Sequence, residues 1–248
     1  MSDLLADLRR TYDWSACTRN TYLKNLNSYM IWLEKRGVIQ NNNLRKAERA
    51  TQNIREQPCL TECEIDKVKT YLQNHKFQYT LEKSRNLLYV SLLTYTGARK
   101  CEVLDLNVED IFQKSDQWKI RVSGRKQKAR VRYYNCPEII IEHYQKYMHL
   151  RRMKAYTCPK LFVSVQTGSP WTSSGANRFY KRVYLATGVR FSGHRVRRYV
   201  ATELDKKGLS LHKISRYLGH QRISTTELYI ARSGSLTEDG GMIMEKIL

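Results

Sequence analysis

The chain has 248 residues, enough for one large domain or two small ones, and its 44 Lys and Arg residues against 23 Asp and Glu residues give a formal net charge of +21. This excess runs through the whole chain and favours a polyanionic partner, with nucleic acid ahead of an anionic membrane or of a basic surface that is simply solvated. No apolar run approaches the roughly 18 residues of a membrane span, and residues 1–10 lack the apolar core of a signal peptide, so we expect no membrane partner.

The first predicted element is a helix over residues 18–36, where apolar side chains recur at helical spacing before a glycine. The polar stretch 41–58 has no such periodicity and ends at a proline. We therefore predict a short helical DNA-binding segment at 1–45 and a linker at 46–58. Basic side chains at this junction either contact a phosphate backbone or remain solvated, and they include Arg45 and Lys46.

The catalytic domain, predicted over residues 59–231, is mostly α with a small β-sheet. Capping boxes, apolar periodicity and terminal glycines predict helices over residues 61–72, 87–97, 99–106, 137–152, 171–187, 194–207, 210–218 and 224–231. Residues 118–124 and 128–134 flank a polar, basic turn, which indicates a β-hairpin. After the last helix, the tail 232–248 begins as a polar, glycine-rich tether and ends in an apolar tip that either folds back on its own domain or docks on a neighbour.

The six cysteines do not predict a zinc site. Cys59 and Cys63 alone lie close together, and no CxxC pair or matching histidine cluster accompanies them. Clustered carboxylates of the kind that hold a divalent cation are also missing from the sequence. We expect no metal, no cofactor and a reduced protein of the cytoplasm, or of the compartment that holds the host DNA.

Five polar residues of the second domain stand at helix starts and loop edges: Arg99, His194, Arg197, His220 and Tyr229. The two guanidinium forks suit bidentate contact with phosphate oxygens, and the two imidazoles can hydrogen-bond a phosphate and titrate near neutral pH. A tyrosine phenol has an unperturbed pKa of about 10, so it becomes a nucleophile only beside a base or positive charge. The set fits metal-free phosphoryl transfer to a protein tyrosine.

These motifs resemble those of the tyrosine recombinase, or phage integrase, family. TGARKCEVLDLNVEDI resembles the family's first arginine motif. GHRVRRYVATELDKKGLSLHKISRYLGHQRISTTELYI resembles its second block, with His-x-x-Arg, Leu-Gly-His and a tyrosine nine residues beyond that histidine. The resemblance covers roughly residues 58–231, and more loosely 18–45. It implies a tyrosine-recombinase catalytic domain preceded by a shortened helical core-binding segment.

The resemblance also implies a role for each position. Arg99 and Arg197 would clamp the scissile phosphate, and His194 and His220 would assist by hydrogen bonding and proton transfer. Tyr229 would attack to give a 3′-phosphotyrosyl link and a free 5′-hydroxyl. Glu102, one helical turn from Arg99, either orients that arginine or forms a plain surface ion pair.

The chain departs from the family pattern in the hairpin turn. The family has Gly-Lys-Gly there, and its lysine protonates the leaving 5′-oxygen, whereas this chain has arginine at the lysine position, and arginine is a poor proton donor. We assign the general acid to Lys126, with Lys128 as the alternative, and expect DNA contacts from Arg125, Lys128 and Arg130. Arg198 also stands where many members carry histidine, and the N-terminal segment is shorter than a usual core-binding domain.

The sequence therefore predicts a site-specific recombinase that acts on double-stranded DNA as a homo-tetramer at synapsis, with accessory proteins possible and the tail 232–248 exchanged between protomers. One alternative is a DNA-binding accessory or regulatory protein that kept the fold. Another is a type IB topoisomerase-like enzyme, which uses similar chemistry as a monomer.

Overall fold

A computed structural model of the protein describes residues 14–47, 49–50, 59–124 and 131–220. The chain divides into two compact units, Met1–Glu56 and Gln57–Leu248, and each is described by itself. Within these described ranges, no helix is long and apolar enough to cross a membrane.

The first unit contains the predicted long helix, α2 (Ala16–Lys35), which begins where the Ser15 hydroxyl accepts from the Thr18 backbone N–H. The polar stretch 41–58, which has no helical periodicity in the sequence, contains the 3₁₀-helix η1 (Asn43–Lys46). The 3₁₀-helix was not predicted because its sequence is mostly polar. The Asn42 side chain caps it by accepting from the Leu44 backbone N–H, and Leu44 is buried. Arg45 forms an exposed ion pair with Glu34 (2.5 Å).

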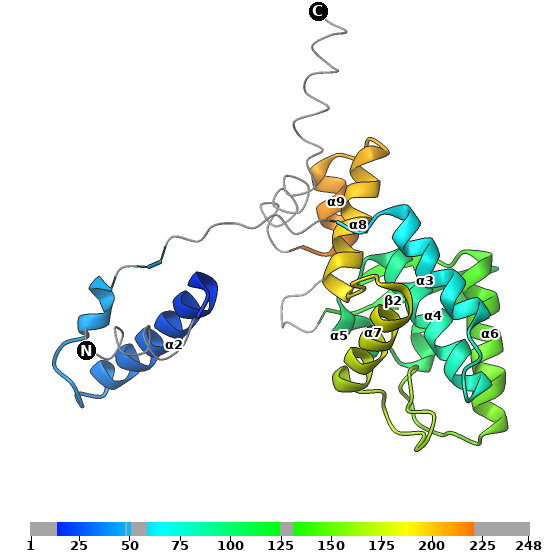
Figure 1. The fold of residues 1–248 in the computed structure, drawn as a ribbon, viewed down its shortest axis with the longest axis horizontal. Helices are drawn as coiled ribbons and strands as arrows, with labels where there is room; N and C mark the ends of the chain where they lie inside the picture. The colour runs from blue at the N-terminus through cyan, green and yellow to red at the C-terminus, as the bar shows by residue number, and fades with distance from the viewer. Residues whose placement is uncertain (1–13, 48, 51–58, 125–130, 221–248) are drawn as a thin grey trace, which may run out of the picture. The chain divides into compact units, whose positions relative to one another are not determined.

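The second unit is mostly helical and includes one small sheet (Figure 1). Its helices are α3 (Glu62–Asn74), α4 (Thr80–Thr96), α5 (Lys100–Leu104), α6 (Glu138–Met153), α7 (Ser173–Thr187), α8 (Gly193–Lys206) and α9 (Leu211–Leu218), with a 3₁₀-helix η2 (Val108–Asp110). Each corresponds to a predicted helix except η2. The helix predicted over 224–231 lies outside the described residues.

The predicted hairpin is confirmed and belongs to a sheet of order β1-β2-β3. Strand β2 (Gln117–Val122) pairs antiparallel with β3 (Arg132–Asn135), and the turn at 125–130 lies outside the described residues. The sequence did not predict strand β1 (Ile111–Lys114), which pairs antiparallel with β2. The turn between them uses two residues other than glycine at positive φ, Ser115 and Asp116, so it lacks the glycine that marks most tight hairpins.

Helix α4 forms the centre of the core and fixes the position of the site. It packs against α3, α6 and α8, and most of its residues are buried. It ends at Gly97 in the left-handed conformation (φ 58°). A Cβ at Gly97 would lie 2.5 Å from Leu218 Cδ2 and 3.1 Å from Val200 Cγ1. Glycine therefore lets the end of α4 meet α8 and α9, which brings together the two sequence blocks that carry the predicted catalytic residues.

Candidate active site

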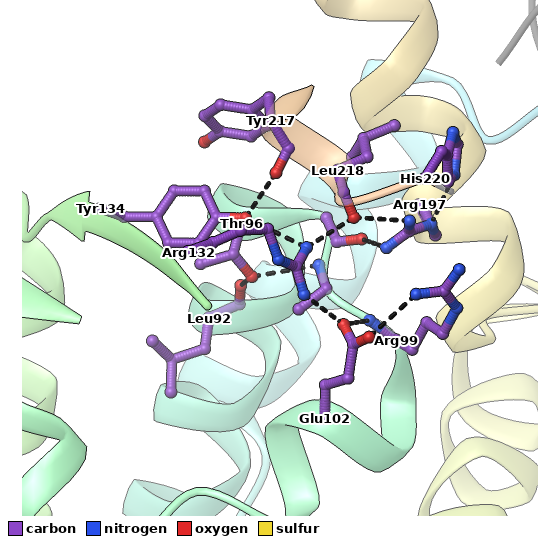
Figure 2. Close-up of polar contacts among 12 residues, drawn as sticks. Leu92, Thr96, Arg99, Glu102, Arg132, Tyr134, Arg197, Tyr217, Leu218 and His220 are labelled. Atoms are coloured by element: carbon purple, nitrogen blue, oxygen red, sulfur yellow. Dashed lines mark hydrogen bonds and ion pairs between the residues drawn. The ribbon is translucent and has the colours of Figure 1, made fainter. Parts of the chain in front are cut away.

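The site begins at the turn between α4 and α5, where Arg99 and Glu102 bond to each other (Figure 2). The Arg99 backbone N–H donates to Glu102 Oε2 (3.0 Å), and Arg99 Nη1 donates to Glu102 Oε1 (2.9 Å). The Glu102 side chain is 2% exposed, whereas the Arg99 side chain is 40% exposed. The alternative of a plain surface ion pair is therefore wrong: a buried carboxylate orients an arginine that faces solvent.

Arg132, a buried arginine on β3, also donates to the Glu102 carboxylate. It was not identified from the sequence as a site residue. Its Nη2 donates to Glu102 Oε2 (2.5 Å), and its Nη1 donates to the Leu218 carbonyl (2.5 Å) and the Tyr134 hydroxyl (3.2 Å). Strand alternation was the available signal, since Arg132 and Tyr134 share the buried face of β3. This alternation indicates that the Arg132 side chain points inward, but it does not identify the residues that Arg132 contacts.

Arg197 connects the ends of α4 and α9. Its Nη1 donates to the Gly97 carbonyl (2.8 Å), its Nη2 to the Leu218 carbonyl (2.6 Å) and its Nε to His220 Nε2 (3.1 Å). The residue is 1% exposed. These bonds place the two predicted arginine motifs and the Leu-Gly-His segment in one hydrogen-bonded cluster, in which Leu218 O accepts from both Arg132 and Arg197 (Figure 2).

His220 is neutral in this environment. Burial, followed by the positive charges of Arg197, Arg99 and Arg132, lowers its pKa to about 3. The sequence-based expectation that it titrates near neutral pH is therefore wrong. Because Arg197 Nε–H donates to Nε2, the neutral ring carries its hydrogen on Nδ1, which makes Nδ1–H a donor.

The cluster is suited to an anion. Three guanidinium groups (Arg99, Arg132 and Arg197) and one carboxylate (Glu102) leave it with a net charge of +2, that is, three minus one. The described ranges hold no group of three or more His, Cys, Asp or Glu that could bind a metal ion. A phosphate is the ligand that matches this set of fixed N–H donors.

The other predicted residues belong to α8, to the first unit, or to segments outside the described ranges. His194, three positions before Arg197, is exposed near the start of α8, and its side chain has no hydrogen-bond partner among the described residues. Arg198, in the same helix, is buried. Arg45 and Lys46 belong to the first unit. Five predicted residues lie outside the described ranges: Arg125, Lys126, Lys128, Arg130 and Tyr229.

Residues 59–234 match the family model described as the phage integrase family. A tyrosine recombinase of Thermosipho africanus is 26% identical over 216 residues, which cover 86% of this chain and 71% of that protein. Tyrosine recombinase XerH of Campylobacter jejuni is 28% identical over 151 residues, and XerA of Pyrococcus furiosus 29% over 151. The matches cover 58% and 60% of this chain, and 40% of XerH and 50% of XerA, so the chain spans about half the length of these two relatives.

Solved structures share the fold. XerH site-specific recombinase, bound to a palindromic difH substrate, has a TM-score of 0.78 at 21% identity, over 98% of this chain and 72% of that one. Lambda integrase, as a dimer bound to a COC′ core site, has a TM-score of 0.67 at 16% identity, over 92% and 77%. The predicted fold class, a mostly helical tyrosine-recombinase catalytic domain with a small sheet, is confirmed.

Proposed function

The chain belongs to the phage integrase family, as its motifs predicted, and we propose that it is a site-specific recombinase that cleaves and rejoins double-stranded DNA through a 3′-phosphotyrosyl intermediate. One observation carries the proposal: the hydrogen-bonded cluster of Arg99, Glu102, Arg197 and His220. Residues from two distant sequence blocks meet there around a net positive charge, which matches the chemistry that the family motifs imply.

In the proposed mechanism the arginines hold the scissile phosphate. Arg99 is oriented by Glu102 and faces solvent, so it can contact the phosphate without a rearrangement of the site. Arg197 is fixed by two backbone carbonyls and is 1% exposed, so contact with a phosphate requires a local rearrangement around it. Both would stabilise the charge that develops on the non-bridging oxygens in the transition state.

The chemical step follows from these fixed donors. The Tyr229 hydroxyl gives up its proton to solvent water as its oxygen attacks phosphorus. The bond from phosphorus to the 5′-oxygen breaks, and the Lys126 ammonium gives a proton to that leaving oxygen. Neutral His220 donates from Nδ1–H to the phosphate, and His194 adds a second hydrogen bond. Attack of a 5′-hydroxyl on the phosphotyrosine reverses these steps and rejoins the strand.

We propose the same assembly as the motifs imply: a homo-tetramer on two DNA sites, with accessory proteins possible. Lambda integrase has been solved as a tetramer bound to a Holliday junction, which supports this arrangement by analogy. Its parts would be the DNA-binding segment 1–45, the linker 46–58, the catalytic domain 59–231 and an exchanged tail 232–248. In the segment, the linker and the hairpin, DNA-backbone contacts would come from Arg45, Lys46, Arg125, Lys128 and Arg130.

Covalent trapping tests the proposal. The protein is incubated with genomic fragments that carry nicks, and DNA that stays attached in SDS is sequenced to identify the target site. We expect a defined site and a DNA–protein adduct that the Tyr229→Phe variant does not form, although it still binds that site. Sequence-specific binding without any adduct from the unaltered protein would favour the accessory-protein alternative.

A further inference from the structure

Arg132 differs from the other buried arginines in where its partners lie. Its side chain is 7% exposed, and arginine is rarely buried to this degree unless it is paired. Arg151, by comparison, donates to the carbonyls of residues 158, 160 and 161, close to the end of its own helix, and interacts with Tyr147 of the same helix. Arg132 reaches two partners, Glu102 and the Leu218 carbonyl, that are 30 and 86 positions away, and both belong to the candidate active site.

Each partner of Arg132 is shared with one of the predicted catalytic arginines. Glu102 accepts from Arg132 and, with both oxygens, from Arg99. The Leu218 carbonyl accepts from Arg132 Nη1 (2.5 Å) and from Arg197 Nη2 (2.6 Å). Arg132 thus shares one acceptor with each of the two arginines (Figure 2).

The turn before His220 is shaped to fit this side chain. A Cβ at Gly219 would lie 2.8 Å from Arg132 Nε, 2.9 Å from Cδ and 3.0 Å from Cζ, so only glycine leaves room for the guanidinium. A second anchor lies two residues along β3, where the Tyr134 hydroxyl donates to the Tyr217 carbonyl (2.6 Å). The end of α9, and with it His220, therefore rests on strand β3 of the hairpin.

We propose that Arg132 is a positioning residue of the recombination reaction, which holds Glu102 and the Leu218 carbonyl together and so fixes Arg99, Arg197 and His220 relative to one another and to the hairpin. The role rests on the proposed function. It makes strand β3 part of the same hydrogen-bonded cluster as the proposed phosphate clamp.

The charges agree with this role. Burial alone would raise the pKa of Glu102, but the charge of Arg132 and the bonds from Arg99 bring that pKa below its ordinary value. Arg132 also contributes to the positive field that keeps His220 neutral. Removal of Arg132 should therefore weaken the hydrogen bonds that position Arg99 and Arg197. Loss of a buried arginine elsewhere should lower only the stability of the fold.

The first test needs no DNA. In ¹⁵N NMR spectra of the full chain, the Arg197 Nε–H and the His220 ring nitrogens report the bond between these two residues directly. We expect Arg132→Met to speed exchange of the Arg197 Nε–H with solvent by about tenfold or more, because a lost hydrogen bond of about 1.4 kcal/mol corresponds to that factor. His220 should also leave its single Nδ1–H tautomer. Arg151→Met, the matched control, should change neither signal, and unchanged signals in a folded Arg132→Met variant would overturn the proposal.

The second test uses the DNA site recovered by covalent trapping, with either a normal scissile phosphate or an uncharged methylphosphonate. Cleavage by Arg132→Met should be about 100-fold slow on the phosphate, the size of effect seen when one transition-state donor is lost, and less impaired on the methylphosphonate, which has less charge to clamp. Arg132→Lys, which keeps the charge, should recover part of the rate. Arg151→Met should behave alike on both substrates; an equal defect of Arg132→Met on both would contradict positioning. Failure of the unaltered protein to form any adduct would instead reject the proposed function and leave the NMR result to stand alone.

Discussion

The candidate active site has a buried end and an open end, and the two are built differently. At the buried end, Glu102, Arg132 and Arg197 are almost fully enclosed. The two arginines donate there to the Glu102 carboxylate, to backbone carbonyls, and to the side chains of Tyr134 and His220. At the open end, Arg99 is 40% exposed and His194 is exposed. The site thus combines a buried, hydrogen-bonded support with exposed side chains that can contact a ligand.

The difference separates two kinds of contribution to function. A charged group enclosed by the protein must be paired, so the buried end links the geometry of the site to the stability of the fold. A group at the surface contributes little to stability, so its effect appears only when a ligand is bound. Substitutions at the two ends should therefore separate stability from cleavage.

The largest effect is expected at Glu102. Glu102→Ala leaves Arg132 buried without its carboxylate, and we expect the free energy of unfolding to fall by about 3–5 kcal/mol, the usual result of removing one partner of a buried pair. Urea denaturation measures this. Glu109→Ala, in an ion pair whose carboxylate is 76% exposed, serves as the control and should cost less than about 1 kcal/mol. Similar losses for the two variants would mean that the buried end does not carry stability.

Arg99→Ala should show the opposite pattern. Because its side chain is exposed, we expect a change in unfolding free energy within about 1 kcal/mol, but a cleavage rate lower by about 100- to 1000-fold, as for loss of a transition-state donor. Single-turnover adduct formation on the recovered site measures the rate. Arg182→Ala is the control, because Arg182 is 49% exposed and pairs with Glu82 in the same unit. Normal cleavage by Arg99→Ala would remove this arginine from the clamp.

His220 lies between the two ends, and its effect should depend on pH. Its pKa is about 3 in the folded chain and about 6.5 when unfolded, so below pH 6.5 the unfolded state takes up a proton that the folded state does not. Stability from this group is complete above about pH 6.5 and is lost as pH falls toward 3. Relative to His220→Gln, the unaltered protein should lose up to about 1.4 kcal/mol of unfolding free energy per pH unit between pH 6 and 4. Parallel urea-denaturation curves for the two proteins across this range would contradict the lowered pKa.

Much of the fold could be predicted because its signals are local. The capping box of Thr61 and Glu64 forms as the sequence indicates, and Gly97 and Gly219 end their helices in the left-handed conformation. The start of α4 was placed seven residues too late, at 87 instead of Thr80, because its first turns bury polar side chains. Arg85 is one of these side chains. Its Cζ lies 4.0 Å from the centroid of the Trp171 ring, a contact that no local sequence pattern reveals.

The chemistry of the site was less predictable, because it depends on partners far apart in the sequence. Spacing identified Arg99, Arg197 and His220, and the structure brings these three into one cluster. Arg132 was missed because its partners come from other elements. The neutral state of His220 was missed for the same reason, since the number of arginines around it is set by tertiary packing.

The smallest effect is expected at His194. Its substitution tests whether the exposed side chains of the site contact the DNA phosphate. This residue is exposed and has no hydrogen-bond partner among the described residues, so His194→Ala should change the unfolding free energy by no more than about 0.5 kcal/mol. A hydrogen bond to a charged phosphate contributes about 1.5–3 kcal/mol, so cleavage should slow by at least about tenfold. The chain offers a matched control in His212, which is also exposed and, like His194, is the second residue of its helix. His212→Ala should leave both stability and cleavage unchanged. If the two variants cleave equally well, His194 does not contact the phosphate, and the clamp consists of the arginines and His220 alone.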